Sequence, residues 1–208
     1  MLTSPMDAFP PELQDRIICS IAAAVRYRVP ANIVLAVAEK EGGRPGQWRS
    51  NRNGTHDVGS MQFNIAYLPD LARFGITADD VATAGCYSFD LAAWRLRQHL
   101  YKDKGDLWTR AANYHSRTPQ YNQVYRADLI RKASKWADWL DAHFVTFDMF
   151  KESPTQPPEH NRQVPWHGVE TQGGKAAVSK GKGSPLQDAK TGYVPRRLIT
   201  DKPSAEKR

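Results

Sequence analysis

Large aromatic side chains become scarce in this chain of 208 residues after Phe150, where only Trp166 and Tyr193 follow. The same segment, 151–208, contains seven Pro and six Gly. It therefore cannot bury enough apolar surface to offset the entropy that is lost when a backbone is ordered. We expect residues 1–150 to form one folded domain and residues 151–208 to form a disordered tail.

Charge divides the chain at the same place. Residues 1–150 carry 18 basic and 16 acidic side chains, whereas the tail carries 11 basic and six acidic ones. A basic flexible tail can contact nucleic acid, an anionic membrane or an anionic wall polymer, or it can be a solubilising or processed extension only. Because the folded part is nearly neutral and no predicted helix carries a basic stripe, binding of nucleic acid is not expected.

Signals for membrane insertion and export are not evident. No stretch reaches the roughly eighteen apolar residues that a membrane-spanning helix needs. Asp7 and Glu12 occupy the region where a signal peptide carries basic residues, and the apolar run at 17–25 is short and fits an amphipathic helix better.

Helical patterns dominate the first part of the domain. Pro11 begins a first helix, whose apolar residues recur near one face. Pro30 begins a second helix, which ends at Gly42 and Gly43, as expected from the preference for Pro in the first helical turn and for Gly after the last.

The rest of the domain combines one turn signal with further helical periodicity. Asn53-Gly54 predicts a tight turn, followed by a short strand at 58–63. Apolar spacing predicts three more helices, at 87–104, 106–115 and 120–144. The last helix is expected to have an apolar face made of Tyr121, Val124, Tyr125, Leu129, Ala133, Trp136 and Leu140. A mainly α-helical fold follows.

Glu41 stands at the end of the second helix, on the same face as Val34, Val37 and Ala38. Burial against this face and the negative end of the helix dipole both disfavour the ionised carboxylate. A glutamate placed in this way can keep its proton near neutral pH and act as a general acid. On position alone, an ordinary helix-end glutamate exposed to water is the alternative. Glu39 points away from this face and is expected to be a solvated surface charge.

Other polar residues near Glu41 offer weaker candidates. Asp57 is expected to bond the amides of a turn, although it is also a possible second carboxylate for a hydrolase. His56 and His115 do not have the spacing of metal ligands and are interpreted as groove-lining or surface residues. Trp48, which is near Glu41 in the sequence, either lines a groove by stacking or packs in the core. No metal and no cofactor is predicted.

Two segments together resemble the goose-lysozyme-like lytic transglycosylases. Residues 36–43 read AVAEKEGG, and residues 51–64 read NRNGTHDVGSMQFN. In that family a glutamate ends a helix and is followed by a Gly-x-Met-Gln motif, here GSMQ at 59–62. The Asn-Gly-x-x-Asp-Val-Gly segment before it resembles the subgroup that serves conjugal transfer and type IV secretion. A later motif is similar to ANYHS at 112–116, where His115 replaces the Asn of many relatives.

The resemblance, which covers residues 13–140, implies a lysozyme-like α+β fold with a small β-hairpin region and a single catalytic carboxylate. Glu41 would protonate the glycosidic oxygen between N-acetylmuramic acid and N-acetylglucosamine, and would then act as a base while the muramyl hydroxyl forms an anhydro sugar. The resemblance implies that substrate is bound or oriented by Gly59, Ser60, Met61, Gln62 and Tyr114. It also implies a disulfide between Cys19 and Cys86, which from their number and spacing could equally be buried thiols.

The expected setting is the periplasm or cell envelope, with glycan strands of peptidoglycan as the partner. The enzyme would open the wall locally for a conjugation or secretion apparatus, whose components the tail could bind. A non-catalytic wall-binding assembly factor and a hydrolytic muramidase are the alternatives.

Overall fold

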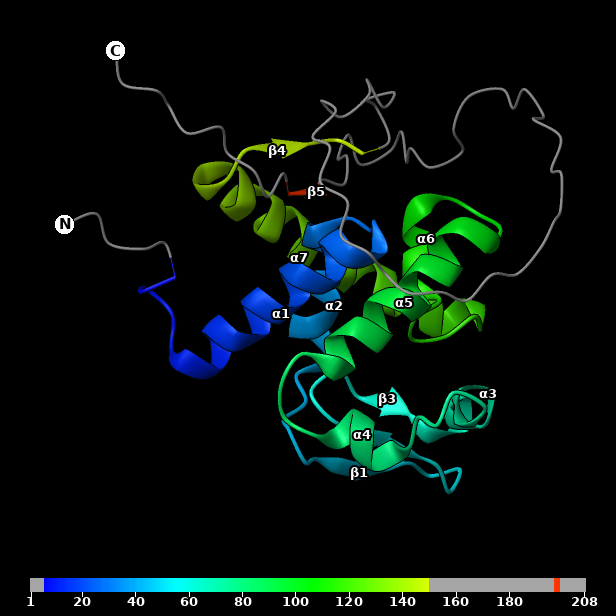
Figure 1. Cartoon of the computed structure of the whole chain (residues 1–208). Coiled ribbons are helices and arrows are strands. Elements are labelled where there is room, and N and C mark those ends of the chain that lie inside the picture. The colour runs from blue at the N-terminus through cyan, green and yellow to red at the C-terminus, as the bar shows by residue number, and fades with distance from the viewer. Residues whose placement is uncertain (1–5, 150–196, 199–208) are drawn as a thin grey trace, which may run out of the picture.

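The computed structural model describes residues 6–149 and 197–198. Its helices are α1 (Pro11–Tyr27), α2 (Ala31–Glu41), α3 (Leu68–Ala72), α4 (Ala78–Ala82), α5 (Tyr87–Lys102), α6 (Leu107–Ala112) and α7 (Pro119–His143), with a 3₁₀ turn η1 (Ile65–Tyr67) before α3. Its strands are β1 (Trp48–Ser50), β2 (His56–Val58), β3 (Phe63–Asn64), β4 (Thr146–Phe147) and β5 (Arg197–Leu198). Figure 1 shows a larger lobe of long helices above a smaller lobe with β1, β3, α3 and α4. The predicted mainly helical α+β fold is confirmed.

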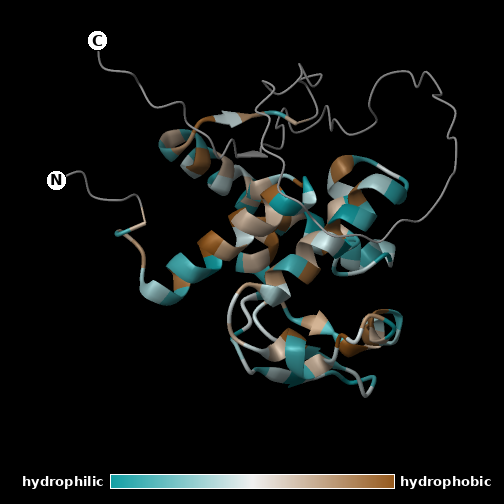
Figure 2. Cartoon of the chain, viewed as in Figure 1, coloured by the Kyte–Doolittle hydropathy of each residue, from teal (hydrophilic) through white to brown (hydrophobic). Residues whose placement is uncertain are grey.

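The helix that carries Glu41, α2, lies inside the larger lobe. All residues from 31 to 38 are buried, and the helix packs against α1, α5 and α7. A helix that is apolar on every side is stable only in such an interior position. The helix ends where predicted, because Gly42 adopts a left-handed conformation with a φ of 59°. In contrast, brown and teal residues alternate along α1 in Figure 2, as in a helix with one apolar face.

The smaller lobe is built on an antiparallel sheet with the strand order β1-β2-β3. The predicted turn at Asn53-Gly54 joins β1 to β2, and Gly54 has a positive φ of 80°. The apolar face of the sheet packs in a second, smaller core with α3, α4 and the start of α5. The buried side chains of this core are Val58, Phe63, Leu71, Val81, Ala82 and Leu91.

The predicted strand at 58–63 is wrong in its central part. Strand β2 ends at Val58, the chain turns through 59–62, and β3 begins only at Phe63. Gly59 and Gln62 both have positive φ angles, of 69° and 45°, which are incompatible with a continuous strand. The short helices α3 and α4 were not predicted, since five residues are too few for apolar periodicity to emerge.

The long C-terminal helix also differs in which face it buries. Tyr121 and Val124 belong to its predicted apolar face but are exposed. The buried residues are Asn122, Tyr125, Leu129, Ala133, Trp136, Ala137 and Leu140. The buried stripe therefore includes Tyr125 as predicted, but at the start of the helix Asn122 is buried in place of Tyr121 and Val124.

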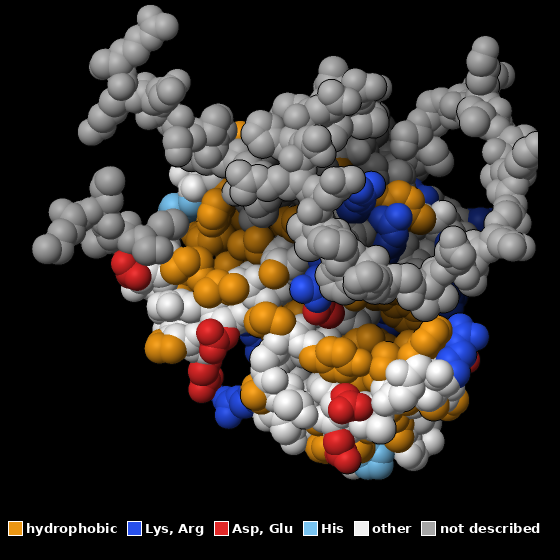
Figure 3. Space-filling model, in the orientation of Figure 1, with side chains coloured by type: hydrophobic (Ala, Val, Ile, Leu, Met, Phe, Trp, Pro, Cys, Tyr) orange, Lys and Arg blue, Asp and Glu red, His pale blue; other side chains and the backbone are white. Residues whose placement is uncertain are grey.

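Most of the predicted disordered tail, 151–208, lies outside the described residues. Residues 197 and 198 are described, and they pair as strand β5 with strand β4, which follows α7. No helix within the described part of the chain is long and apolar enough to cross a membrane. On the face shown in Figure 3, basic and acidic side chains both occur, and the described residues do not form one continuous basic surface.

A disulfide connects helix α1 to the start of helix α5. It links Cys19 in α1 to Cys86, which immediately precedes α5, over a sequence separation of 67 residues. Both cysteines of the chain are used in this bond.

Candidate active site

A polar cleft of about 510 Å³ lies between the helical lobe and the sheet lobe. The helical side contributes Glu41, Arg95, Tyr114 and His115, and the sheet side contributes Arg49, Asn51, Asn53, Asp57, Gln62, Asn64, Ala66 and Tyr67. Arg95, Tyr114 and His115 are far in sequence from the residues of the sheet side, which lie between Arg49 and Tyr67. The cleft is therefore a product of the tertiary fold.

Glu41 is half-buried at the point where α2 reaches the cleft. The hydroxyl of Tyr125, on α7, donates a hydrogen bond of 2.7 Å to Glu41 Oε1. Tyr125 was predicted only as part of an apolar helix face. No local signal links it to Glu41, because 84 residues separate them.

The environment of Glu41 favours its protonated form. Burial raises the pKa of Glu41 from 4.5 to about 7, and the negative charge of Asp57 acts in the same direction. The hydrogen bond from Tyr125 and the charges of Arg95 and Lys40 oppose this rise. The balance gives a carboxyl that can both donate and accept a proton near neutral pH, as general acid–base catalysis requires.

Arg16 holds the end of helix α2 in place. Its Nη1 donates a hydrogen bond of 2.6 Å to the carbonyl oxygen of Ala38, and its Nη2 donates one of 2.6 Å to that of Gly43. These two carbonyls lie on either side of Glu41 in the sequence, and that of Ala38 also accepts a hydrogen bond of 3.2 Å from the Gly42 amide. The sequence offered no sign of this role, since Arg16 lies on another helix.

The Gly-x-Met-Gln turn packs directly against the residues that follow Glu41. A Cβ atom on Gly43 would lie 2.3 Å from the carbonyl oxygen of Gly59 and 2.8 Å from Gln62 Nε2. A Cβ atom on Gly59 would lie 2.4 Å from the carbonyl oxygen of Val81. Gly43 is therefore required for the close approach that brings Gln62 next to the end of α2, and Gly59 is required for the close approach of the turn to α4.

The five residues predicted to bind substrate divide into two groups. Gln62 and Tyr114 line the cleft, and Gln62 Nε2 donates to the carbonyl oxygen of Gly59 over 3.0 Å. Gly59, Ser60 and Met61 are not among the lining residues of this cleft. The Met61 side chain is fully buried in the main core, and its carbonyl oxygen accepts a 3.1 Å hydrogen bond from the Tyr114 hydroxyl. Met61 therefore packs in the core behind the cleft and holds Tyr114, which lines it.

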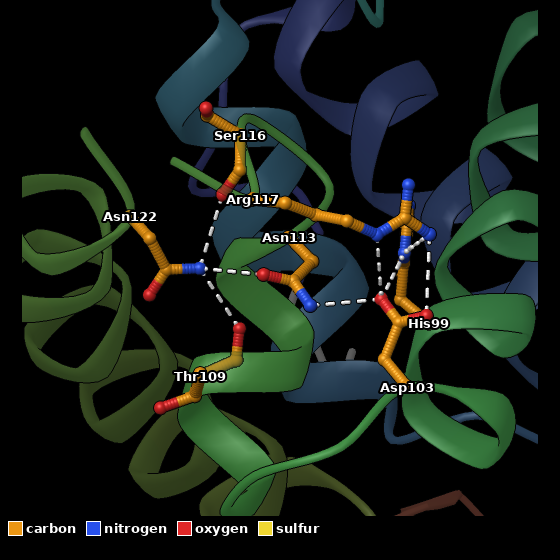
Figure 4. Close-up of polar contacts among 7 residues, drawn as sticks. All are labelled: His99, Asp103, Thr109, Asn113, Ser116, Arg117 and Asn122. Atoms are coloured by element: carbon orange, nitrogen blue, oxygen red, sulfur yellow. Dashed lines mark hydrogen bonds and ion pairs between the residues drawn. The ribbon is translucent and has the colours of Figure 1, made fainter. Parts of the chain in front are cut away.

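The loop between α6 and α7, which carries Tyr114 and His115, is held by a polar network (Figure 4). Asp103 accepts a hydrogen bond of 2.8 Å from Asn113 and contacts His99 at 2.8 Å and Arg117 at 3.2 Å. Burial alone would raise the pKa of Asp103, but the hydrogen bonds from Arg117, His99 and Asn113 lower it to about 2.

Asn122, on α7, completes this network from the other side. Its Nδ2 lies 2.8 Å from Asn113 Oδ1, 3.1 Å from the carbonyl oxygen of Ser116 and 3.0 Å from that of Thr109. The Asn of the ANYHS motif thus anchors the loop, whereas the Tyr that follows it faces the cleft.

His115 lines the cleft, as one of the two interpretations of it predicted. Its ring stacks on that of Tyr125, with centroids 4.8 Å apart and planes 5° from parallel. Burial and the charge of Lys40 lower the pKa of His115. The neutral ring therefore covers one face of the tyrosine that bonds Glu41.

Two acidic residues differ from their predicted roles. Asp57 lies in strand β2 and does not bond turn amides. Its Oδ1 accepts a 2.7 Å hydrogen bond from Asn64, the residue opposite it on β3, and its side chain faces the cleft. Glu39 is not a solvated charge: it is half-buried and bonds Lys132 at 2.9 Å and Trp136 Nε1 at 2.7 Å on α7. Glu39 therefore joins α2 to α7.

Trp48 and His56 lie outside the set of residues that line the cleft. The Trp48 side chain is 46% exposed, which excludes the core-packing role, and it meets the His56 ring edge-on at 6.0 Å. Within residues 6–149 and 197–198, no three His, Cys, Asp or Glu side chains form a group that could hold a metal ion.

Comparison with known proteins gives a consistent result. The family model described as the transglycosylase SLT domain matches residues 18–136. Protein IpgF of Shigella flexneri is 31% identical over 119 residues, which cover 55% of this chain and 78% of that protein. Invasion protein IagB of Salmonella typhimurium (strain SL1344) is 26% identical over 118 residues, which cover 56% of this chain and 71% of that protein. The family match includes Glu41, Tyr125 and both cysteines.

Proposed function

The chain belongs to the transglycosylase SLT domain family, and from this premise we propose that it is a peptidoglycan lytic transglycosylase. Its substrate is the glycosidic bond between N-acetylmuramic acid and N-acetylglucosamine. The observation that carries the proposal is Glu41, a carboxyl in a polar cleft whose pKa is raised by burial to about 7. A protein that only binds the wall has no need of such a group.

The first step is proton donation to the glycosidic oxygen. Since Tyr125 donates to Oε1 of Glu41, the acidic proton is carried by Oε2. Transfer of this proton lets the bond between the muramyl C1 and the bridging oxygen break. N-acetylglucosamine then leaves with a free hydroxyl, and an oxocarbenium-like muramyl centre remains.

The second step returns the proton to Glu41. The carboxylate now accepts the proton of the muramyl C6 hydroxyl, and the hydroxyl oxygen bonds to C1. The product is an anhydromuramyl end, and no water is consumed. The Tyr125 hydrogen bond stabilises the carboxylate between the two steps. Gln62 and Tyr114, which line the same cleft, are proposed to position the sugars.

A hydrolytic muramidase is the second candidate, because Asp57 faces the same cleft as Glu41. A second carboxylate can activate a water molecule, as in inverting glycosidases. Mass spectrometry of fragments released from purified peptidoglycan separates the two reactions. Anhydromuropeptides are expected, whereas reducing muramyl ends would assign the hydrolytic reaction. No release at all would favour a wall-binding assembly factor.

We further propose that the enzyme acts in the periplasm or cell envelope and opens the wall locally for a secretion or conjugation apparatus. The Cys19–Cys86 disulfide supports an oxidising compartment. The similarity to an invasion protein supports a role in an envelope-spanning apparatus. Tail residues 151–208 are the segment proposed to bind its components. Non-reducing mass mapping of the protein from fractionated cells tests the location.

Replacement of Tyr125 by Phe is expected to shift the pH dependence of catalysis upward. The hydrogen bond from Tyr125 lowers the pKa of Glu41, so its loss raises that pKa further. The alkaline limb of the kcat/KM profile should therefore move to higher pH, and the maximum should fall by about 10- to 100-fold, the range for a hydrogen bond to a charged group. Tyr121→Phe, at an exposed position on the same helix, is the matched control. A downward shift of the limb would contradict this account of the Glu41 pKa.

A further inference from the structure

Arg95 is a cleft residue that the proposed reaction does not use. It lies on α5, its exposed fraction is only 7%, and its side chain lines the same cleft as Glu41. A cation so deeply buried is normally paired with an acidic group.

The guanidinium of Arg95 is held by aromatic rings. Its central carbon lies 3.6 Å from the ring centroid of Tyr67, 4.8 Å from that of Tyr114 and 5.6 Å from that of Phe63. Such cation–π contacts offset part of the loss of hydration and fix the plane of the group. They leave its N–H donors unused.

The acidic residues of the cleft do not supply a partner. Asp57 is bonded to Asn64, and Glu41 is bonded to Tyr125. In residues 6–149 and 197–198, no hydrogen bond or ion pair reaches the Arg95 guanidinium. The N–H donors of the Arg95 guanidinium are therefore fixed in direction and without a hydrogen-bond partner among the described residues of the cleft. Two parallel N–H groups of a guanidinium fit the two oxygens of a carboxylate.

We propose that Arg95 binds a carboxylate of the glycan substrate, carried either by the lactyl group of the muramyl sugar or by the peptide attached to it. The inference rests on the proposed function, which supplies the polymer. N-acetylglucosamine carries no carboxylate, so Arg95 selects peptidoglycan over neutral polymers of N-acetylglucosamine. It also fixes which sugar of the alternating strand lies next to Glu41.

Binding measurements on the full chain with Glu41→Gln, which prevents turnover, test the selection. Three kinds of probe are compared. Chitohexaose is neutral, and denuded glycan strands carry free lactyl carboxylates. Peptide-bearing strands are used with and without amidation of the peptide carboxylates. Adding Arg95→Gln should weaken binding to the carboxylate-bearing glycan by about 10- to 100-fold and leave chitohexaose unchanged. Arg95→Lys should recover part of the affinity. Arg73→Gln, at an exposed position outside the cleft lining, removes the same charge and should change nothing.

The pattern across the probes identifies the carboxylate. An effect on denuded strands assigns the lactyl group, and an effect on peptide-bearing strands that disappears on amidation assigns the peptide. Equal losses for chitohexaose and for the anionic strands would reduce Arg95 to a structural support and overturn the proposal. So would a shifted pH profile of wall cleavage with unchanged affinities, since Arg95 would then act only on Glu41.

This test is separable from that of the proposed function. Absence of glycan binding together with absence of cleavage by the unmodified chain would reject the transglycosylase assignment itself. Cleavage by the unmodified chain, combined with no charge-selective effect of Arg95→Gln, would reject only the role of Arg95.

Discussion

Replacement of Glu41 by Gln is expected to lower the release of anhydromuropeptides from peptidoglycan by about 1,000-fold. Gln has nearly the same shape as Glu but carries no transferable proton, and positioned general acids contribute about 10²- to 10⁴-fold to a rate. Initial rates of fragment release, followed by chromatography and mass spectrometry, measure the effect.

Glu39→Gln is the matched control for this variant. It removes the same charge from the same helix, but Glu39 bonds α7 outside the cleft. This variant should retain its activity at temperatures where it is folded. Comparable activity of the Glu41→Gln protein and the unmodified chain would remove Glu41 from the mechanism.

The Glu41→Gln protein also tests the raised pKa of Glu41, in an experiment that needs no substrate. The folded-state pKa of Glu41, about 7, lies above the value of 4.5 for an exposed glutamate. Between these two values the folded protein binds more protons than the unfolded chain, so this group lowers the free energy of unfolding as the pH rises through the window. Above pH 7 the Glu41→Gln protein should therefore be more stable, by as much as about 3 kcal/mol. At pH 4 the difference should disappear. Urea unfolding at the two pH values measures it.

Removal of the disulfide is expected to have the second large effect. Replacing Cys19 and Cys86 by Ala releases a loop closed over 67 residues. In the chain-entropy model this lowers the free energy of unfolding by about 4 kcal/mol. For a domain of this size the melting temperature should fall by roughly 10 °C.

Reductant supplies the control for this prediction. The unmodified chain should lose the same stability when its disulfide is reduced, whereas the double variant should not respond. A stabilising disulfide would be contradicted if the unmodified and double-variant proteins were equally stable without reductant. Two free thiols in protein recovered from the periplasm would show that the bond does not form in that compartment.

Local patterns in the sequence were sufficient for much of the fold. The helices α1, α2, α5, α6 and α7 follow from apolar periodicity and from Pro and Gly at their ends. The turn at Asn53-Gly54 follows from the preference of that dipeptide. The prediction of a strand through 59–62 is wrong because the positive φ angles of this turn depend on packing of Gly59 against Val81 and Gly43, which are distant in sequence. The prediction of a solvated Glu39 is wrong for a similar reason, since the partners of Glu39 lie on α7.

The sequence predicts Glu41 as the candidate acid, because its position at a helix end, its apolar face and the motif after it are all local features. The tertiary structure alone decided what surrounds it. Tyr125 bonds Glu41 from α7, and Asp57 and Arg95 line the cleft from β2 and α5. No spacing rule connects these residues to α2. A pKa depends on burial and on charges acting through space. The sequence therefore determined which carboxyl is the candidate, whereas packing decided that its pKa is raised to about 7.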